Sequence, residues 1–312
     1  MTDFAALLDA GAVAFSDDGD GVEDDVVMRT ALEHARDLSA VIIQHCEYKA
    51  LSAGGVMHLG EVCRRAGLPG LDPRSEEAMI ERDLELCRAA GGRYHVAHIS
   101  TARAVELVKQ AKAEALPVTA EVCVHHLVLT EAACAGADPN TKIHPPLRTE
   151  ADVEACRRGL LDGTIDCIVT DHAPHAVEEK AVGFLRAPPG VVGLETAVPL
   201  IHHAMIESGL ADWRQVIAWL TTGPAAVLGR GRKAIDPGAL ADLTLIDPAV
   251  RWTVEPQRFL TKGRNTPFTG WTLTSLARGT VRGRQVILVR RPEDETGAPS
   301  SSIARNVEKR GA

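Results

Sequence analysis

The sequence predicts an α/β fold of the TIM-type (β/α) barrel kind, followed by a small C-terminal β domain. Short apolar runs rich in β-branched residues alternate with longer helical patterns, which is typical of β/α units around a parallel sheet. Five such strand-like runs occur between residues 12 and 171. Each is followed closely by an aspartate or a histidine, and the carboxyl ends of barrel strands are where active sites lie.

Glycine and proline mark the ends of the expected elements. Gly11 ends the first helix, Pro73 and Ser75 begin a later one, and Gly91-Gly92 ends it. On this basis we expect strands over 12–16, 40–44, 94–97, 117–122 and 167–169. The expected helices cover 2–10, 24–38, 74–90, 102–115 and 150–162.

The C-terminal part changes character. Helices are expected over about 194–208 and 212–228, and strands over 235–247 and 279–290. We therefore predict a partial barrel catalytic domain over 1–234, a small β domain over 235–292 and a disordered polar tail over 293–312.

Bulk composition excludes several classes of protein. The 312 residues carry a formal net charge of −8 and only 4% aromatics, which excludes a basic nucleic-acid surface and a base-stacking platform. No apolar run reaches the length of a membrane span. Seven scattered cysteines with no C-x-x-C pair indicate reduced thiols, so a cytoplasmic protein is expected.

The stretch from Ile165 to His175 concentrates titratable side chains. An apolar run gives way to Asp171, His172 and His175, and Pro174 prevents continuation of the strand. The alternative interpretation is a helix-capping aspartate with two loop histidines. The other strand ends carry similar groups, which favours a metal or acid/base site: Asp17 and Asp18, His45, His98, and His125 and His126. For each of these residues alone, a structural or turn role is the simpler interpretation.

Several longer stretches resemble the class I dihydroorotases of the amidohydrolase superfamily. The similarity runs from near residue 5 to about residue 289. The stretches that carry it are Ala14–Gly19, Gln44–Glu47, His95–Thr101, Pro145–Arg148, Thr170–His175, Gly190–Thr196, Ala241–Leu243 and Asn265–Phe268.

The resemblance implies a fold, an activity and a set of site residues. The family interconverts N-carbamoyl-aspartate and dihydroorotate in pyrimidine biosynthesis by closing and opening the dihydroorotate ring. Its barrel uses one or two Zn²⁺ ions. By resemblance, the metal ligands would be Asp18, His45, His98 and Asp171, with Asp18 bridging and Asp171 also the catalytic base and acid. The substrate contacts would be His144, His175, Pro189 and Gly190.

The chemistry independently requires these residue types. Hydrolysis of a ring amide needs a nucleophile stronger than water, and zinc lowers the pKa of bound water to roughly 7. Neutral imidazoles and carboxylates suit zinc. A carboxylate such as Asp171 can take the proton and pass it to the departing nitrogen, and a nearby cation would keep it ionised.

Two departures from the family pattern affect the expectation. No His-x-His occurs in the 312 residues, although the first barrel strand of the superfamily ends in that pair of zinc ligands. Either the chain lacks its natural N-terminal third, or it is a degenerate paralogue. In addition, His144 stands where the family usually has a substrate-contacting Asn.

Alternative functions remain at this point. A degenerate relative would act as a non-catalytic partner of aspartate carbamoyltransferase, and a homodimer is also compatible with the family. Hydantoinases and allantoinases use a carboxylated lysine at the bridging position, where this chain has Ser16-Asp17-Asp18-Gly19. The absence of lysine there favours the dihydroorotase interpretation over those cyclic amidases.

Overall fold

A computed structural model describes residues 1–231 and 233–288 of the chain. The predicted tail over 293–312 lies outside the described residues, as do the last residues of the predicted β domain. The α-helices are α1 (Phe4–Asp9), α2 (Asp25–Asp37), α3 (Lys49–Ser52), α4 (Glu61–Ala66), α5 (Arg74–Ala90), α6 (Ala102–Ala113), α7 (Glu150–Asp162), α8 (Val177–Lys180), α9 (Ala197–Ile201), α10 (Trp213–Leu220) and α11 (Thr222–Val227).

The main sheet has five parallel strands in the order β1-β2-β5-β6-β7. Its strands are β1 (Phe15–Ser16), β2 (Val41–Gln44), β5 (Arg93–Val96), β6 (Val118–Cys123) and β7 (Cys167–Val169). All five predicted strands are therefore present, and they pair in chain order. Their carboxyl ends consequently meet at one edge, as the sequence analysis expects.

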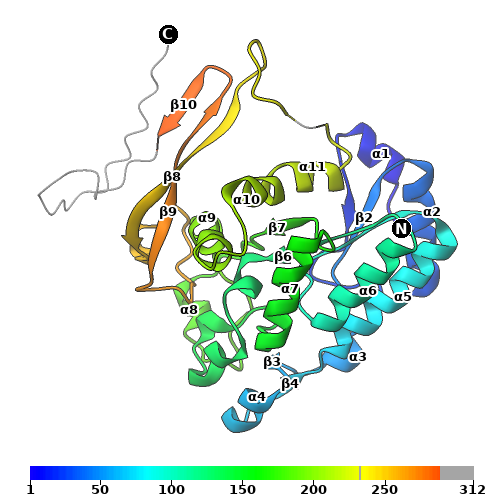
Figure 1. Cartoon of the computed structure of the whole chain (residues 1–312). Helices are drawn as coiled ribbons and strands as arrows, with labels where there is room; N and C mark the ends of the chain where they lie inside the picture. The colour runs from blue at the N-terminus through cyan, green and yellow to red at the C-terminus, as the bar shows by residue number, and fades with distance from the viewer. Residues whose placement is uncertain (232, 289–312) are drawn as a thin grey trace, which may run out of the picture.

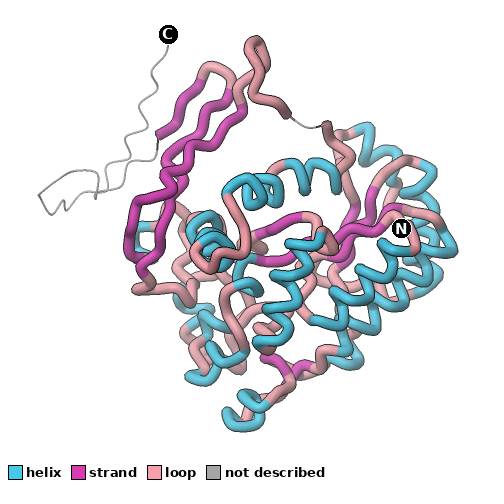
Figure 2. Tube along the Cα trace, viewed as in Figure 1, coloured by secondary structure: helices cyan, strands magenta, loops and turns pink. Residues whose placement is uncertain are grey.

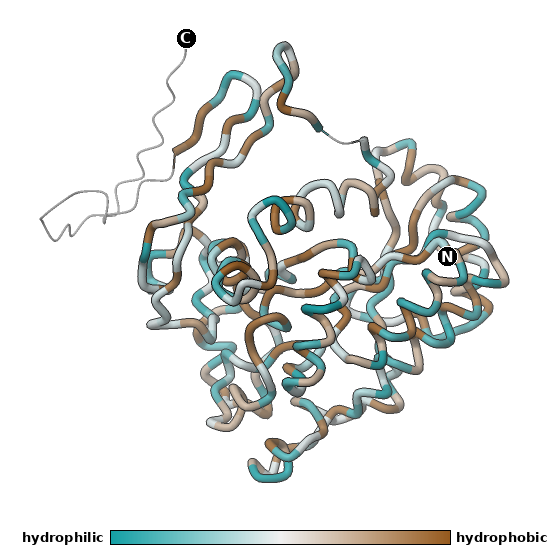
Figure 3. Tube along the Cα trace, viewed as in Figure 1, coloured by the Kyte–Doolittle hydropathy of each residue, from teal (hydrophilic) through white to brown (hydrophobic). Residues whose placement is uncertain are grey.

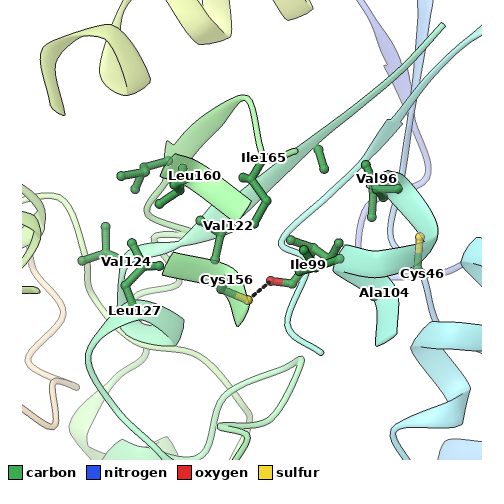
Figure 4. Close-up of a cluster of buried hydrophobic side chains, with 14 of the residues drawn as sticks. Cys46, Val96, Ile99, Ala104, Val122, Val124, Leu127, Cys156, Leu160 and Ile165 are labelled. Atoms are coloured by element: carbon green, nitrogen blue, oxygen red, sulfur yellow. Dashed lines mark hydrogen bonds between the residues drawn. The ribbon is translucent and has the colours of Figure 1, made fainter. Parts of the chain in front are cut away.

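Helices cover one face of this sheet. α2, α5, α6 and α7 pack side by side in chain order, as Figure 1 shows. The strand residues that point toward them are buried, including Ile42, Tyr94 and Val122. Figure 3 shows mostly apolar segments through the middle of the molecule, whereas hydrophobic and hydrophilic residues alternate along the outer helices. Figure 4 shows part of this core, where the Cys156 thiol on α7 lies 3.9 Å from the Ile99 carbonyl oxygen.

The other face of the sheet is less apolar. On this face, Ser16 of β1 lies beside Ile43 of β2, and Ile43 lies beside His95 of β5. Ser16 is exposed, Ile43 is half-buried and His95 is buried. Asp18 and His45 lie two residues beyond Ser16 and Ile43, so the site residues continue this face past the strand ends.

The C-terminal segment forms a separate antiparallel sheet in the order β10-β9-β8 (Figure 2). Its strands are β8 (Asp242–Thr253), β9 (Thr272–Arg282) and β10 (Gln285–Leu288). The expected strand over 279–290 is in fact two strands, because the chain turns at Gly283, which has a φ of 59°. The expected strand over 235–247 begins only at Asp242, after a turn.

Several short elements were not expected. The segment between β2 and α5 contains α3, α4 and a two-stranded parallel pair, β3 (Met57–His58) and β4 (Gly70–Leu71). The segment after β6 contains three 3₁₀ turns, Val124–Leu127, Glu131–Gly136 and Pro139–Thr141. The expected helix over 194–208 is α9 continued by a π-helical turn over His202–Ile206, and that over 212–228 is divided into α10 and α11. A last 3₁₀ turn covers Pro256–Arg258. In the part of the chain that is described, no helix has the length and apolar character required to cross a membrane.

Gly223 provides a test of how α11 packs against the start of β7. A Cβ atom at Gly223 would lie 2.2 Å from the carbonyl oxygen of Asp166, a backbone atom that has little freedom to move. Gly223→Ala is therefore expected to destabilise the protein by about 1–3 kcal/mol, measured by urea unfolding. Gly136→Ala is the control, because nothing lies within 4 Å of a Cβ there. Equal stability of the two variants would contradict this packing.

Candidate metal and catalytic site

Three of the predicted metal ligands come together at the carboxyl ends of β1, β2 and β5. One ligand atom each from Asp18, His45 and His98 lies within 4.8 Å of the others. The Nδ1 atom of His45 faces the Nε2 atom of His98 at 2.9 Å. We call these three residues the ligand cluster. Two nitrogens and a carboxylate oxygen are donors that suit zinc, so the residues present fit the metal that the sequence analysis expects.

Burial favours the neutral form of the histidine ligands. His98 is fully buried, which lowers its pKa well below the usual range, and the neighbouring His45 and His144 lower it further. Only a neutral imidazole nitrogen can bind a metal ion. Burial therefore keeps His98 in the neutral form that a ligand requires.

Asp171 is within electrostatic reach of the ligand cluster but is not one of its members. It follows β7 with a φ of 45°, a backbone conformation that aspartate and asparagine tolerate better than most residues. Burial raises the pKa of Asp171, the charge of Asp18 raises it further, and His45 opposes both. Asp18 and His45 therefore act electrostatically on Asp171, while no group of mutually close ligand atoms among the described residues includes it.

Glu47 is a site residue to which the sequence analysis assigned no role. Its Oε2 atom lies 3.0 Å from Nε2 of His144 and 3.5 Å from Nε2 of His45. The rings of His45 and His144 stack with their centroids 5.3 Å apart. Burial acts to raise the pKa of Glu47, but its contacts with the imidazoles of His144 and His45 outweigh it and hold the pKa well below its usual range. The signal in the sequence was a carboxylate two residues beyond a candidate ligand at a strand end.

The other predicted substrate contacts, His175, Pro189 and Gly190, also come together. Nε2 of His175 lies 2.9 Å from the carbonyl oxygen of Pro189. A Cβ at Gly190, which has a φ of 128°, would collide with Ala173, so this position requires glycine. The amide of Gly190 donates to the carbonyl oxygen of Lys142, two residues before His144.

Asn265 joins the loops around His175. Its Oδ1 atom accepts the amide hydrogen of His175 at 3.0 Å. Its Nδ2 atom donates to the carbonyl oxygens of Ala173 at 2.9 Å and Gly190 at 3.0 Å. Asn265 falls in a stretch that resembles the family, but local sequence pattern assigns it no role because its partner His175 lies 90 residues away along the chain.

The remaining histidines of the strand ends have structural contacts. His172 Nδ1 accepts the amide hydrogen of Gly193 at 3.1 Å, and His126 Nε2 lies 3.1 Å from the carbonyl oxygen of Pro145. His95 contacts Thr119 at 2.7 Å. Among the described residues, ligand atoms also come close together in three further groups: Cys123 with His125 and His126, His45 with Glu47 and His144, and His95 with Glu121 and Cys167.

Buried neutral histidines make the protein sensitive to acid. Burial lowers the pKa of His58 to about 4, helped by Arg148, and burial lowers the pKa of His125 to about 3. Below about pH 6.5 the unfolded chain binds protons that the folded chain does not. Above that pH these histidines should not lower the free energy of unfolding. As the pH drops toward 4, the free energy of unfolding should fall by about 1.4 kcal/mol per pH unit for each such histidine.

Urea unfolding at neutral pH and at about pH 5 measures this loss. His58→Gln should reduce the pH dependence of stability, whereas replacing the exposed His34 should leave it nearly unchanged. A pH dependence that is identical in both variants would contradict the role of His58.

The fold and the ligand cluster define the class of protein. Among solved structures, the chain is similar to a dihydropyrimidinase from Brevibacillus agri, with a TM-score of 0.78, 21% identity, and coverage of 91% of this chain and 65% of that one. It is also similar to an L-hydantoinase from Arthrobacter aurescens, with a TM-score of 0.78, 26% identity, and coverage of 91% and 66%. The fold is therefore that of the amidohydrolase-type barrels, with a C-terminal antiparallel sheet.

Sequence comparison identifies the family within this class. A family model described as "Dihydro-orotase-like" matches residues 1–104. The chain is 49% identical over 288 residues to a dihydroorotase of Pelotomaculum thermopropionicum, covering 92% of this chain and 67% of the relative. It is 47% identical over 271 residues to one of Bacillus caldolyticus, covering 87% and 64%. The chain belongs to the dihydroorotase family, and it spans about two thirds of the length of these relatives.

Proposed function

We propose that this chain carries a zinc-dependent dihydroorotase site that interconverts N-carbamoyl-L-aspartate and (S)-dihydroorotate. The observation that carries the proposal is the ligand cluster, in which Asp18, His45 and His98 converge, with Asp171 within electrostatic reach of Asp18 and His45. The relatives named above as dihydroorotases support the choice of substrate. The seven cysteines are all free and buried, which supports a reducing compartment such as the cytoplasm.

Each residue of the site would have a separate role in the reaction. Zinc, when bound, would supply a water of lowered pKa and polarise the amide carbonyl. Asp18, His45 and His98 would hold the ion. Asp171 would accept the proton of the attacking water and return it to the ring nitrogen that departs. The charge of Asp18 raises the pKa of Asp171, and His45 lowers it.

Substrate binding would fall to the loops beyond the ligand cluster. The imidazole of His144 is 27% exposed and provides a hydrogen-bonding group beside His45. His175 and the backbone at Gly190 lie on a neighbouring loop, which Asn265 holds in place. These groups are suited to the polar atoms of a small, charged cyclic amide.

Metal analysis combined with a turnover assay tests the proposal. The 312-residue chain, purified in the presence of zinc, should retain zinc and hydrolyse dihydroorotate, and chelation should abolish both. His98→Ala should lose the metal because it removes a buried nitrogen donor. Turnover that persists after complete removal of metal would contradict the proposal.

We also propose, as the alternative, a dihydroorotase-like subunit that binds aspartate carbamoyltransferase without turning over substrate, as the family resemblance implies for degenerate relatives. Size-exclusion chromatography of the chain, alone and with aspartate carbamoyltransferase from the same organism, separates a homodimer, a mixed complex and neither. A mixed complex without zinc or turnover would support the alternative and contradict the enzyme proposal.

A further inference from the structure

We propose that Glu47 is a positioning residue that orients the ligand His45 and anchors His144, so that the metal site and the substrate-facing side chain form one unit. The proposal deepens the proposed function and rests on the role of His45 as a metal ligand.

The two nitrogens of His45 face different partners. Nδ1 points at Nε2 of His98, 2.9 Å away, inside the ligand cluster. Nε2 is buried, makes no hydrogen bond in the described structure, and lies 3.5 Å from Oε2 of Glu47, the carboxylate oxygen toward which its proton can be directed. A neutral imidazole carries one N–H and one lone pair. With the proton on Nε2, directed at the carboxylate, the lone pair on Nδ1 is directed into the ligand cluster.

A carboxylate behind a histidine ligand is a recurring way to choose its tautomer. The carboxylate accepts the second ring N–H, fixes the ring orientation and makes the ligating nitrogen more basic. Glu47 is well placed for this because it follows β2 directly after His45-Cys46. Its amide nitrogen also contacts the sulfur of the buried Met79 at 3.2 Å, which holds the backbone against α5.

The same oxygen of Glu47 serves His144. Oε2 lies 3.0 Å from Nε2 of His144, and the His144 ring stacks on that of His45 with an interplanar angle of 24°. One carboxylate oxygen therefore links a candidate ligand from β2 to a residue that precedes α7 by six positions. A shift of either imidazole changes the hydrogen bond available to the other.

Metal affinity is the first readout. Loss of such a carboxylate typically costs 10–100-fold in metal affinity. Glu47→Gln should therefore weaken zinc binding by about 10–100-fold, measured by competition with a chromogenic chelator. Glu207→Gln is the matched control, because Glu207 also contacts two histidines, His203 at 2.9 Å and His202 at 3.5 Å, outside the site. It should bind zinc as the wild type does.

The tautomer of His45 is the second readout, and a purely structural role for Glu47 would not change it. In zinc-free protein labelled with ¹⁵N-histidine, His45 should be protonated on Nε2 in the wild type and in Glu207→Gln. Glu47→Gln should show a mixture of tautomers or the Nδ1-protonated form. The His45 signals are assigned by their loss in His45→Gln, and circular dichroism checks that each variant folds.

A substitution of His144 distinguishes the effect of Glu47 on metal binding from its effect on substrate binding. His144→Asn keeps the contact between Glu47 and His45, so its zinc affinity should stay within about threefold of the wild type, a difference below 1 kcal/mol. Its KM should rise, and adding Glu47→Gln should raise KM by less than the product of the two single effects. Wild-type zinc affinity and an unchanged His45 tautomer in Glu47→Gln would overturn the proposal. These two measurements are made without substrate, so a failure of dihydroorotate turnover would count against the proposed function alone.

Discussion

Asp171→Asn is expected to lower the turnover of dihydroorotate by about 10²–10⁴-fold, the usual contribution of a positioned general base. The substitution replaces the proton-accepting carboxylate with an amide of nearly the same size. Asp171 has a φ of 45°, and asparagine tolerates that conformation as aspartate does. The loss should therefore appear in kcat, with the folded structure retained in circular dichroism and thermal unfolding.

Asp17→Asn is the control for this prediction. Asp17 is an exposed carboxylate at the same edge of the sheet, and its carbonyl oxygen accepts a turn hydrogen bond from Asp20. It is not a member of the ligand cluster. Steady-state kinetics of both variants should show a loss only in Asp171→Asn. Full turnover in that variant would rule out Asp171 as the base.

Arg148→Met is expected to destabilise the protein by about 3–5 kcal/mol, because it leaves a buried carboxylate without its cation. Arg148 and Glu76 form an ion pair of 3.0 Å, and their side chains are 1% and 3% exposed. Arg148 also donates to Ser100 Oγ at 2.9 Å, and Glu76 accepts the amide hydrogen of Ser100 at 2.8 Å. The pair therefore holds the loop that follows His98.

Urea unfolding of Arg148→Met, with Arg74→Met as the control, measures this contribution. Arg74 begins the same helix as Glu76 but forms an exposed pair with Asp72, and such pairs are worth about 0–1 kcal/mol. Adding Glu76→Gln to Arg148→Met should recover part of the lost stability, since no unpaired charge then remains buried. Equal destabilisation by the two arginine substitutions would show that burial of the pair is unimportant.

Local pattern predicted much of the fold. The helix expected over 150–162 coincides with α7, where Thr149 caps the helix and accepts the amide hydrogen of Asp152 at 3.3 Å. The helix over 74–90 coincides with α5, which ends at Gly91 with a φ of 73°. These boundaries depend on capping residues and glycine, which are local signals. The irregular segments between β2 and α5 and after β6 carry no such periodic pattern and were not predicted.

The candidate site was predictable in part. Residues at strand ends, such as Asp18 and His45, could be found because parallel strands carry their carboxyl ends to one edge. Glu47 was not assigned a role, because its importance lies in a 3.0 Å contact with His144, nearly a hundred positions along the chain. Asn265 was missed for the same reason.

The sequence by itself determined the order of β/α units, the helix boundaries with clear caps, and the residue types that meet at the carboxyl edge of the sheet. Only the tertiary structure decided which of those side chains touch. It grouped Asp18 with His45 and His98, brought Asp171 within electrostatic reach of Asp18 and His45, and placed Glu47 in contact with both His45 and His144. The physical reason is the separation along the chain over which each kind of interaction acts. Periodicity and capping act over a few residues, whereas side-chain contacts between loops depend on strand register and on packing across the whole sheet.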